Sequence, residues 1–392
     1  MPIYSTFISN ELAILVLLSR PHLTLAQRQE LRQRIQSGID KAFLQRLFEQ
    51  HKVWGCAYDN VSKYCQDLLP IELIEYLEKK YQQGVKCNRV SLKQFFQITH
   101  AFKQAGISLK TLKGIPLAQR LYQDIAKRHF KDIDLLIQEK DLAQSNRLLN
   151  QLGYRCEAMD KLPASMMPVY FSVQKDLNYC NDQGSILELH IRLSSYSSQF
   201  STQFLHTIFS NHNFNKSWDP YEEFIYLSWH GSQTLYHRLK WLCDIALIIE
   251  QGNLNFQELY RKASLVSKRR AITNTLILCH HLYTTELPQE AENHYYTDRF
   301  CRQLVNNSLS QLELQHTNSI LISFYSTLSS VLLSESYQDR SAAILHPFKV
   351  NYTDIKCLPC LPSWLHFTYY FARPITFIWR RVIRRNNKAA PQ

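Results

Sequence analysis

Glycine is scarce in this chain, which has 9 glycines among its 392 residues. Glycine supplies the positive φ angles that many tight turns require, so its scarcity favours a helix-rich protein with few such turns. Internal repeats and long low-complexity tracts are also absent. The remaining composition, 45% hydrophobic and 20% charged, is that of a globular protein. At this length we expect about two to three domains.

A hydrophobic run long enough to cross a membrane is missing as well. The apolar run Leu12–Leu18 is too short for a membrane span. Glu11 precedes this run, in place of the basic leader that a signal peptide carries. We therefore interpret the run as a buried helix, and we expect a cytoplasmic protein with no transmembrane segment.

The cysteines lack the spacing of a disulfide framework. The 10 cysteines are scattered along the chain, which indicates reduced thiols. Cys357 and Cys360 form a C-x-x-C motif, but no second pair accompanies them, so we favour packing over a zinc site. Cys279, His280 and His281 are adjacent, and neighbouring residues on a helix point in different directions. We interpret these three as core and surface residues.

Acidic residues are absent after Asp354, and the chain as a whole has a net charge of +12. The tail combines basic and aromatic side chains, namely Lys356, Trp364, Phe367, Tyr369, Tyr370, Phe371, Arg373, Phe377, Trp379, Arg380, Arg381, Arg384, Arg385 and Lys388. Three interpretations are open. The tail contacts the periphery of an anionic membrane, it binds nucleic acid, or its aromatic face packs on the rest of the protein.

Two carboxylates one residue apart open the apolar run Asp132–Ile137. On a β-strand, residues i and i+2 lie on the same face, so we expect Asp132 and Asp134 side by side, with Ile133 and Leu135 buried behind them. Carboxylates this close repel each other unless a cation lies between them, and Mg²⁺ prefers such oxygen ligands. The pair predicts a metal-triphosphate site, with a solvated turn as the alternative.

Two further features support this prediction. Lys113-Gly114 lies upstream, where a helix is expected to begin, and helix N-termini bind phosphate through free N–H groups. Downstream, alternation places Glu188 on the face opposite Leu187 and Leu189. Glu188 would complete a trio with the two aspartates, and an exposed strand residue is the alternative.

The order of these motifs resembles a family of uncharacterised bacterial nucleotidyltransferases (family five), whose core is similar to that of DNA polymerase β. The resemblance rests on Asn88, Lys113-Gly114, Leu121-Tyr122, Arg128, Asp132-Ile133-Asp134-Leu135-Leu136, Leu149, Gly153-Tyr154, Glu188-Leu189-His190, His230, Arg238-Leu239, Trp241, Asp244 and Arg373-Pro374. It covers residues 10–385.

The resemblance implies transfer of a nucleoside monophosphate from an NTP, with ATP expected, to a hydroxyl or phosphate of an acceptor. It implies that Asp132 and Asp134 hold Mg²⁺ against the phosphates, and that Glu188 binds a second Mg²⁺ and helps to deprotonate the acceptor. Two metals clamp the attacking and leaving oxygens of such a displacement. The acceptor stays open among small molecules, peptides, proteins and RNA.

The resemblance also implies that Lys113, Gly114 and Arg128 bind the nucleotide. Gly114 would let the backbone approach the triphosphate, Lys113 would neutralise phosphate charge, and Arg128 would contact phosphate or base. The broader superfamily has Gly-Ser or Gly-Gly at this turn. This chain has Gly114-Ile115, which removes a hydroxyl donor.

Four more polar residues, His190, His230, Arg238 and Asp244, are candidates to reach into the cleft. The alternative for the last three is a buried polar network in which Arg238 pairs with Asp244 and holds helices together. We interpret Trp241 as a core residue rather than a platform for base stacking.

The predicted fold is α+β, a mixed sheet with flanking helices embedded in mostly helical N- and C-terminal regions. We expect a helical region over 1–105, the nucleotidyltransferase core over 106–200, a helical domain over 201–340 and the basic aromatic tail over 341–392. The expected strands are 108–112, 133–137, 153–158, 169–178 and 186–192, and the expected helices include Leu25–Phe48 capped by Thr24, 71–82, 91–104, 115–126, 140–151, Tyr221–Ser232, Tyr236–Gln251 and Asn255–Ser267.

A second class of function stays open. A catalytically inactive scaffold would keep this fold and bind a membrane surface or nucleic acid through the basic aromatic tail. The trio of Asp132, Asp134 and Glu188 favours the enzyme, because folding does not require three carboxylates on one face.

Overall fold

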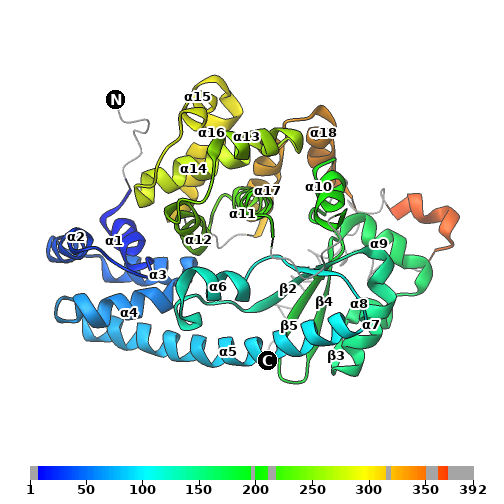
Figure 1. Cartoon of the computed structure of the whole chain (residues 1–392), viewed down its shortest axis with the longest axis horizontal. Coiled ribbons are helices and arrows are strands. Elements are labelled where there is room, and N and C mark those ends of the chain that lie inside the picture. Colours follow the sequence, from blue (N-terminus) through cyan, green and yellow to red (C-terminus); the bar gives the residue numbers. More distant parts are fainter. Residues whose placement is uncertain (1–7, 196–198, 211–217, 315–318, 350–360, 370–392) are drawn as a thin grey trace, which may run out of the picture.

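A mixed five-stranded sheet with helices around it is the architecture of the computed structural model (Figure 1). The structure describes residues 8–195, 199–210, 218–314, 319–349 and 361–369. The strands are β1 (Leu109–Thr111), β2 (Asp132–Ile137), β3 (Tyr154–Arg155), β4 (Asp176–Asn181) and β5 (Ile186–His190). Their order is β1-β2-β5-β4-β3, in which β2 and β5 are parallel and the other neighbours are antiparallel. The predicted α+β class is confirmed.

Alternation along β2 gives the sheet an apolar face and a polar face. Ile133 and Leu135 belong to a hydrophobic core that also contains Phe102 of α5 (Ile71–Gln104) and Leu149 of α7 (Leu142–Gln151). The aspartates of β2 lie on the opposite face and line a cleft together with residues of α11 (Pro220–Gln233) and α12 (Leu239–Glu250). One face therefore builds this core, and the other carries the two aspartates and, further along the strand, Leu136, which lies in a second core.

The N-terminal helices and the later helical region share a second and larger hydrophobic core. The remaining helices are α1 (Asn10–Leu18), α2 (Leu25–Gln36), α3 (Lys41–His51), α4 (Trp54–Tyr64), α6 (Ile115–Tyr122), α8 (Glu157–Lys161), α9 (Met167–Val173), α10 (Gln199–Ser210), α13 (Phe256–Leu265), α14 (Arg269–Tyr283), α15 (Gln289–Thr297), α16 (Arg299–Glu313), α17 (Ser319–Leu333) and α18 (Tyr337–Leu345). Leu15 of α1 and Leu276 of α14 lie in this second core. The predicted domain boundaries stay predictions, but apolar packing joins segments that they separate.

Helix α6 joins the two cores. Its Leu117 and Leu121 lie in the larger core, whereas Ile115 and Ala118 lie in the core under the sheet. A single short helix thus contributes side chains to both cores, and the polar face of the sheet lies between them.

Two predictions about the N-terminal helices are wrong. Leu25–Phe48 is not one helix, because Gly38 adopts φ +107° and Asp40 caps a new helix by accepting a hydrogen bond from Phe43 N. Conversely, 71–82 and 91–104 belong to the continuous helix α5, because a glycine inside a helix costs only about 1 kcal/mol. The predicted cap Thr24 is confirmed and forms a capping box.

Asn88, in the middle of α5, anchors the segment that leads into β2. Its Nδ2 donates to the carbonyls of Ile125 and Arg128 at 2.6 and 3.0 Å, and its Oδ1 accepts from Phe130 N at 3.4 Å. A buried asparagine with three backbone partners fixes the path of the chain just before β2, and so the place where the strand begins with Asp132.

The strands near β3 and β4 also differ from prediction. The strand expected over 153–158 is only Tyr154–Arg155, and α8 follows it. The strand expected over 169–178 is wrong in its first half, where α9 has Pro168 in its first turn and buries Val169 and Val173 on one side. A helix and a short strand both bury such apolar side chains, so the pattern alone did not separate them.

A buried ion pair connects the core to the helical region. Arg128 donates from Nε and Nη2 to the two carboxylate oxygens of Asp244 at 2.7 and 2.6 Å, and Tyr122 donates to the same carboxylate at 2.8 Å. Burial alone would lower the pKa of Arg128, but Asp244 raises it further above its already high value. The expected pairing of Arg238 with Asp244 is therefore wrong.

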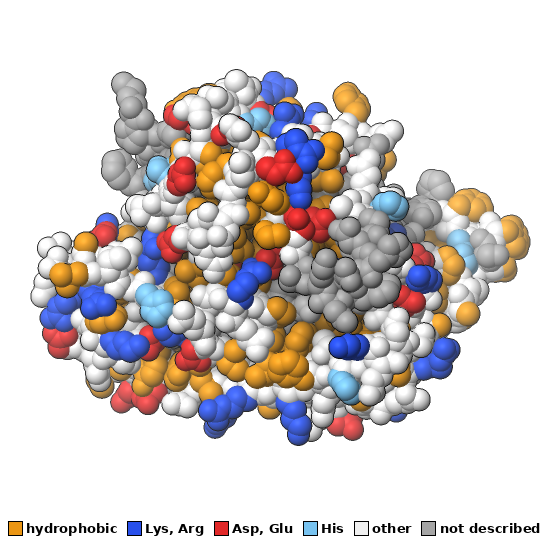
Figure 2. Space-filling view, viewed as in Figure 1, with side chains coloured by type: hydrophobic (Ala, Val, Ile, Leu, Met, Phe, Trp, Pro, Cys, Tyr) orange, Lys and Arg blue, Asp and Glu red, His pale blue; other side chains and the backbone are white. Residues whose placement is uncertain are grey.

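Only part of the C-terminal tail lies in the described residues. Tyr369 is buried against Val169 and Val173, so for this residue the aromatic face packs on the protein. The arginines from Arg373 onward and the Cys357-Cys360 motif lie outside the described residues. No helix that the structure describes is long and apolar enough to cross a bilayer. Figure 2 shows acidic and basic side chains interspersed over the face in view.

The buried ion pair gives a prediction about stability. Asp244→Asn leaves the Arg128 guanidinium buried with only a neutral partner, and we expect a loss of about 3–5 kcal/mol in the free energy of unfolding. Urea denaturation would measure this loss. As a control, Arg238→Met is expected to change that free energy by less than about 1 kcal/mol. Equal destabilisation by both substitutions would instead support a pairing of Arg238 with Asp244.

Candidate active site

The polar face of the sheet brings the predicted carboxylates together. In the parallel pairing of β2 with β5, Asp134 lies directly beside Glu188. Asp132 precedes Asp134 on the same face and is half-buried at the cleft. His190 follows Glu188 on this face, and the antiparallel pairing places Asp176 of β4 beside it. Alternation and register thus gather these groups on one side of three adjacent strands.

Gly114 precedes α6 as its N-cap, at the position that the sequence predicted for the start of a helix. Its φ is +88°, a conformation that side chains with a Cβ rarely adopt. Lys113, directly before it, forms an ion pair with Asp134 through its ammonium group. The turn therefore brings both a helix N-terminus and a lysine to the edge of the carboxylate cluster.

The ion pair between Lys113 and Asp134 sets the charge at the centre of the cleft. Burial alone would lower the pKa of Lys113, but Asp134, Asp132 and Glu188 raise it. Burial alone would raise the pKa of Asp134, but Lys113 and His190 hold it well below its ordinary value. Lys113 is therefore charged and acts as the cation that neighbouring carboxylates need.

The opposite wall of the cleft is basic and aromatic. The cleft has a volume of about 210 Å³ and is lined by Lys113, Gly114, Arg128, Phe130, Asp132, Asp134, Glu188, His230, His237, Arg238, Lys240 and Trp241. The Trp241 ring meets His230 and His237 edge-on, with centroids 5.1 and 4.9 Å apart. Trp241 packs against the larger core, as predicted, and its half-buried side chain also lines the cleft.

Lys240 has an unusual electrostatic environment in this wall. Burial, together with the guanidinium groups of Arg128 and Arg238, lowers its pKa to about 7. Its Nζ donates to the carbonyl of His129 at 3.2 Å. The imidazole of His230 is neutral, because burial and the nearby Lys113 hold its pKa well below the ordinary value.

A buried histidine fixes the start of the helix that carries this wall. His51 of α3 accepts a hydrogen bond from Leu239 N through Nδ1 at 2.9 Å, and its Nε2 lies 2.8 Å from the carbonyl of Leu312. Burial lowers the pKa of His51 to about 4, so it stays neutral at physiological pH. The larger core thus sets the position of the turn that presents Arg238 and Lys240.

The structure brings most of the predicted site residues into one cleft, but some of them have other partners or lie behind the cleft wall. Arg128 lines the cleft, yet Asp244 occupies two of its donors, and Nη1 lies 3.4 Å from the carbonyl of Gly114. Asp244 lies behind the wall and His190 beneath the carboxylates, and neither lines the open space.

Sequence reasoning missed Lys240, His237, Phe130 and Asp176. The first two flank the predicted Arg238 in the turn before α12 and its first residues, which is the signal that could have indicated them. Asp176 becomes visible only through the register of β4 with β5, which no local pattern contains.

The carboxylate wall fits a divalent metal. Asp134, Glu188 and His190 each offer one ligand atom, and these atoms lie within 4.8 Å of one another. The Lys113 ammonium lies where a metal would neutralise Asp134. Carboxylate oxygens beside a binding site for phosphates are the ligands that Mg²⁺ and Mn²⁺ take in proteins.

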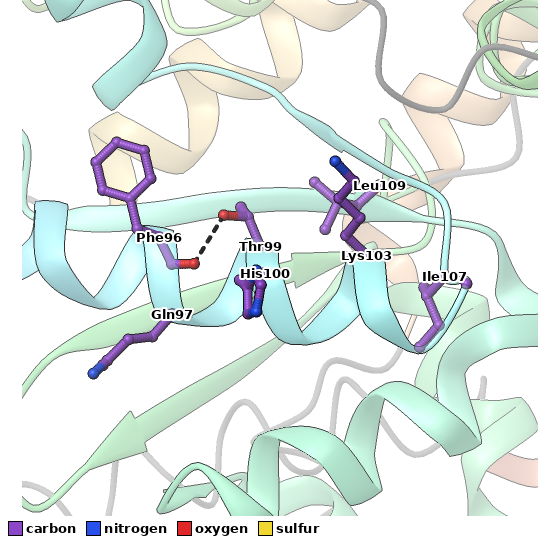
Figure 3. Close-up of a pocket in the computed structure, with 8 residues that line it drawn as sticks. Phe96, Gln97, Thr99, His100, Lys103, Ile107 and Leu109 are labelled. Carbon is purple, nitrogen blue, oxygen red and sulfur yellow. Dashed lines mark hydrogen bonds between the residues drawn. The ribbon is translucent and has the colours of Figure 1, made fainter.

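A larger groove elsewhere on the surface lacks these groups. It has a volume of about 810 Å³ and is lined by Phe96, Gln97, Thr99, His100, Lys103, Gly106, Ile107 and Leu109. Figure 3 shows these side chains along the C-terminal part of α5 and the segment after it. No carboxylate lines it, so the smaller cleft is the better candidate for metal chemistry.

The comparison with protein families agrees with the arrangement of carboxylates and cations in the cleft. The family described as "Uncharacterised nucleotidyltransferase" matches residues 37–284, more than half of the chain, and the chain belongs to this family. The match is shorter than the resemblance expected over 10–385. Membership implies an NTP substrate and a divalent metal. No curated protein and no solved structure matches the chain.

The ion pair of Lys113 with Asp134 predicts competition with a metal. Lys113→Met removes the ammonium and leaves Asp134 buried without its cation, so we expect a divalent metal to bind more tightly in the absence of nucleotide. Calorimetric titration with Mg²⁺ would measure this affinity. The control is Lys131→Met, which removes a positive charge from an exposed position next to Asp132. Unchanged or weaker binding by Lys113→Met would rule the competition out.

Proposed function

We propose that this nucleotidyltransferase moves a nucleoside monophosphate from an NTP, with ATP as the expected donor, to a hydroxyl or phosphate of an acceptor, and that it needs Mg²⁺ or a similar divalent ion. The observation that supports this most is the placement of Asp132, Asp134 and Glu188 on one face of two paired strands, opposite a cationic wall. A bound divalent metal would supply charge neutralisation and alignment of the reacting oxygens.

The proposed reaction is an in-line displacement. The acceptor oxygen attacks the α-phosphorus, the bond between the α-phosphorus and the bridging oxygen breaks, and pyrophosphate leaves. Asp132 and Asp134 would hold a divalent metal that neutralises phosphate charge, and Glu188 would bind a second ion and take the acceptor proton. The low pKa of Asp134 keeps its carboxylate ionised for this task.

The cationic wall has a matching role in this proposal. Arg238 and Lys240 face the carboxylates across the cleft and would bind the β- and γ-phosphates, on which the leaving charge develops. Gly114 allows the phosphates to approach the start of α6. Arg128 holds the turn at Gly114 and Asp244 in place, so we assign it a positioning role.

The same cleft weighs against an inactive scaffold. Three buried or half-buried carboxylates and several cations face each other there, an arrangement that packing of a hydrophobic core does not require. The described part of the tail contributes buried Tyr369, and the basic residues from Lys356 onward lie outside the described residues. A role of the tail at a membrane surface or on nucleic acid stays a second proposal, beside the catalytic one.

The first experiment asks whether the cleft binds a nucleotide with its metal. Calorimetric titration of a non-hydrolysable ATP analogue with Mg²⁺ is expected to show binding by the wild type. Asp132→Asn should abolish the Mg²⁺-dependent binding and leave the fold intact, because the Asp132 side chain makes no hydrogen bond or ion pair within the described residues.

The matched control for this titration is Asp182→Asn. Asp182 is exposed at the turn between β4 and β5, on the same sheet but away from the cleft, so the variant should bind like the wild type. A well-folded wild type that binds no NTP would refute the proposed function.

The pKa of Lys240 gives a pH dependence with a defined sign. As the pH falls from 8 to 6, Lys240 gains a proton and the cleft a positive charge, so nucleotide affinity should rise by up to about tenfold. The charged groups that face it are Arg128, Arg238, Asp132 and Asp244. Lys240→Arg, which stays charged at every pH tested, should bind tightly at pH 8 and lose this part of the dependence.

The comparison of the two proteins isolates the contribution of Lys240 to the pH dependence. The neutral His230 contributes no change in this range. Identical pH profiles of the wild type and Lys240→Arg would show that Lys240 does not contact the phosphates.

A further inference from the structure

His190 is a buried histidine with an unsatisfied ring in the middle of the carboxylate cluster. Its side chain is 2% exposed, and neither ring nitrogen makes a hydrogen bond. A buried polar atom without a hydrogen bond is unfavourable in a folded protein, so such a ring calls for a ligand or a function. The proposed roles of Asp132, Asp134 and Glu188 leave His190 unexplained.

The ring nitrogens of His190 point at two different sets of carboxylates. Nε2 lies 3.5 Å from Oδ1 of Asp134 and 3.5 Å from Oε2 of Glu188. These separations are too long for good hydrogen bonds. They match the spacing of about 3–3.5 Å that ligand atoms take around one ion with metal–ligand bonds of about 2.1 Å. Three ligand atoms therefore surround a position that one ion could fill.

On its other side the ring faces Asp176 without a hydrogen bond. Nδ1 lies 3.7 Å from Oδ2 of Asp176, which is itself buried, and Tyr170 fixes the backbone there by donating to the Asp176 carbonyl at 3.0 Å. Histidines that bind metals commonly direct their second nitrogen at a carboxylate, which selects the tautomer and orients the ring. Asp176 lies in the corresponding direction from His190, so that a ring bound to an ion through Nε2 would turn its Nδ1–H toward this carboxylate.

We infer that Asp134, Glu188 and His190 form a mixed carboxylate-imidazole metal site, oriented by Asp176, that prefers a first-row transition ion such as Mn²⁺ over Mg²⁺. Mg²⁺ is a hard ion that takes oxygen ligands, whereas imidazole suits transition ions. The role of this site as the place of the second metal in the reaction rests on the proposed function. Its ability to bind an ion does not depend on that function. The entering ion displaces the Lys113 ammonium from Asp134.

Pulsed electron paramagnetic resonance of Mn²⁺ bound to the full chain, without nucleotide, tests the site directly. The wild type should show magnetic coupling of Mn²⁺ to a ¹⁴N nucleus of histidine. Labelling all histidines with ¹⁵N should change this coupling to that of ¹⁵N, with no substitution and so no risk to folding. Bound Mn²⁺ without any nitrogen coupling would overturn the inference.

A pair of variants then identifies the histidine. His190→Asn should abolish the nitrogen coupling and weaken Mn²⁺ binding at least tenfold, with a smaller effect on Mg²⁺. His230→Asn is the control in the same cleft and should keep the coupling, because the 4.8 Å cluster does not include His230. Coupling that survives in His190→Asn would assign the nitrogen to another residue and overturn the inference.

Asp176→Asn distinguishes a residue that orients the His190 ring from one that binds the metal itself. Because Asp176 acts through the ring, this variant should keep the nitrogen coupling while Mn²⁺ affinity falls by about 10–100-fold. Unchanged affinity would remove Asp176 from the site. Nitrogen-coupled Mn²⁺ in a protein that binds no NTP would refute the proposed function alone. NTP binding dependent on Asp132, with Mn²⁺ held by oxygens only, would refute the metal site alone.

Discussion

Neutralisation of carboxylates that folding removes from water is the constraint on which this structure depends. Asp134 and Asp244 are almost fully buried, and each has a cation in contact, Lys113 for the first and Arg128 for the second. The first pair lies in the open cleft and the second seals the junction behind it. A buried charge without a partner is strongly unfavourable, so the two pairs fix the turn at Gly114 against both walls.

The sequence predicted the elements whose local pattern has one interpretation. The α+β class, the cap at Thr24, the helix start after Gly114 and the shared face of Asp132 and Asp134 agree with the predictions from alternation, capping and the order of motifs. The single helix predicted over Leu25–Phe48 is wrong, because its apolar spacing continues across a break at Gly38 that only the backbone reveals. Short apolar segments such as α9 stay ambiguous, since a turn of helix and a strand bury similar side chains.

The site was predictable on the sheet and less so on the helices. The spacing of two carboxylates at i and i+2 on a strand predicts that they share a face. The partner of Asp244, in contrast, depends on which element packs against α12. Arg238 was the nearer candidate in sequence, and Arg128 is the partner in space. The lowered pKa of Lys240 and the position of Asp176 beside His190 both depend on residues that are distant in sequence, so no local spacing predicts them.

The cleft lies between two hydrophobic cores to which α5, α6 and β2 all contribute side chains. The Arg128–Asp244 pair adds a polar contact behind the cleft. A ligand that touches both walls of the cleft therefore adds a further link between the two cores. The free energy of binding such a ligand adds to the free energy of unfolding, so a filled cleft also resists separation of the two cores.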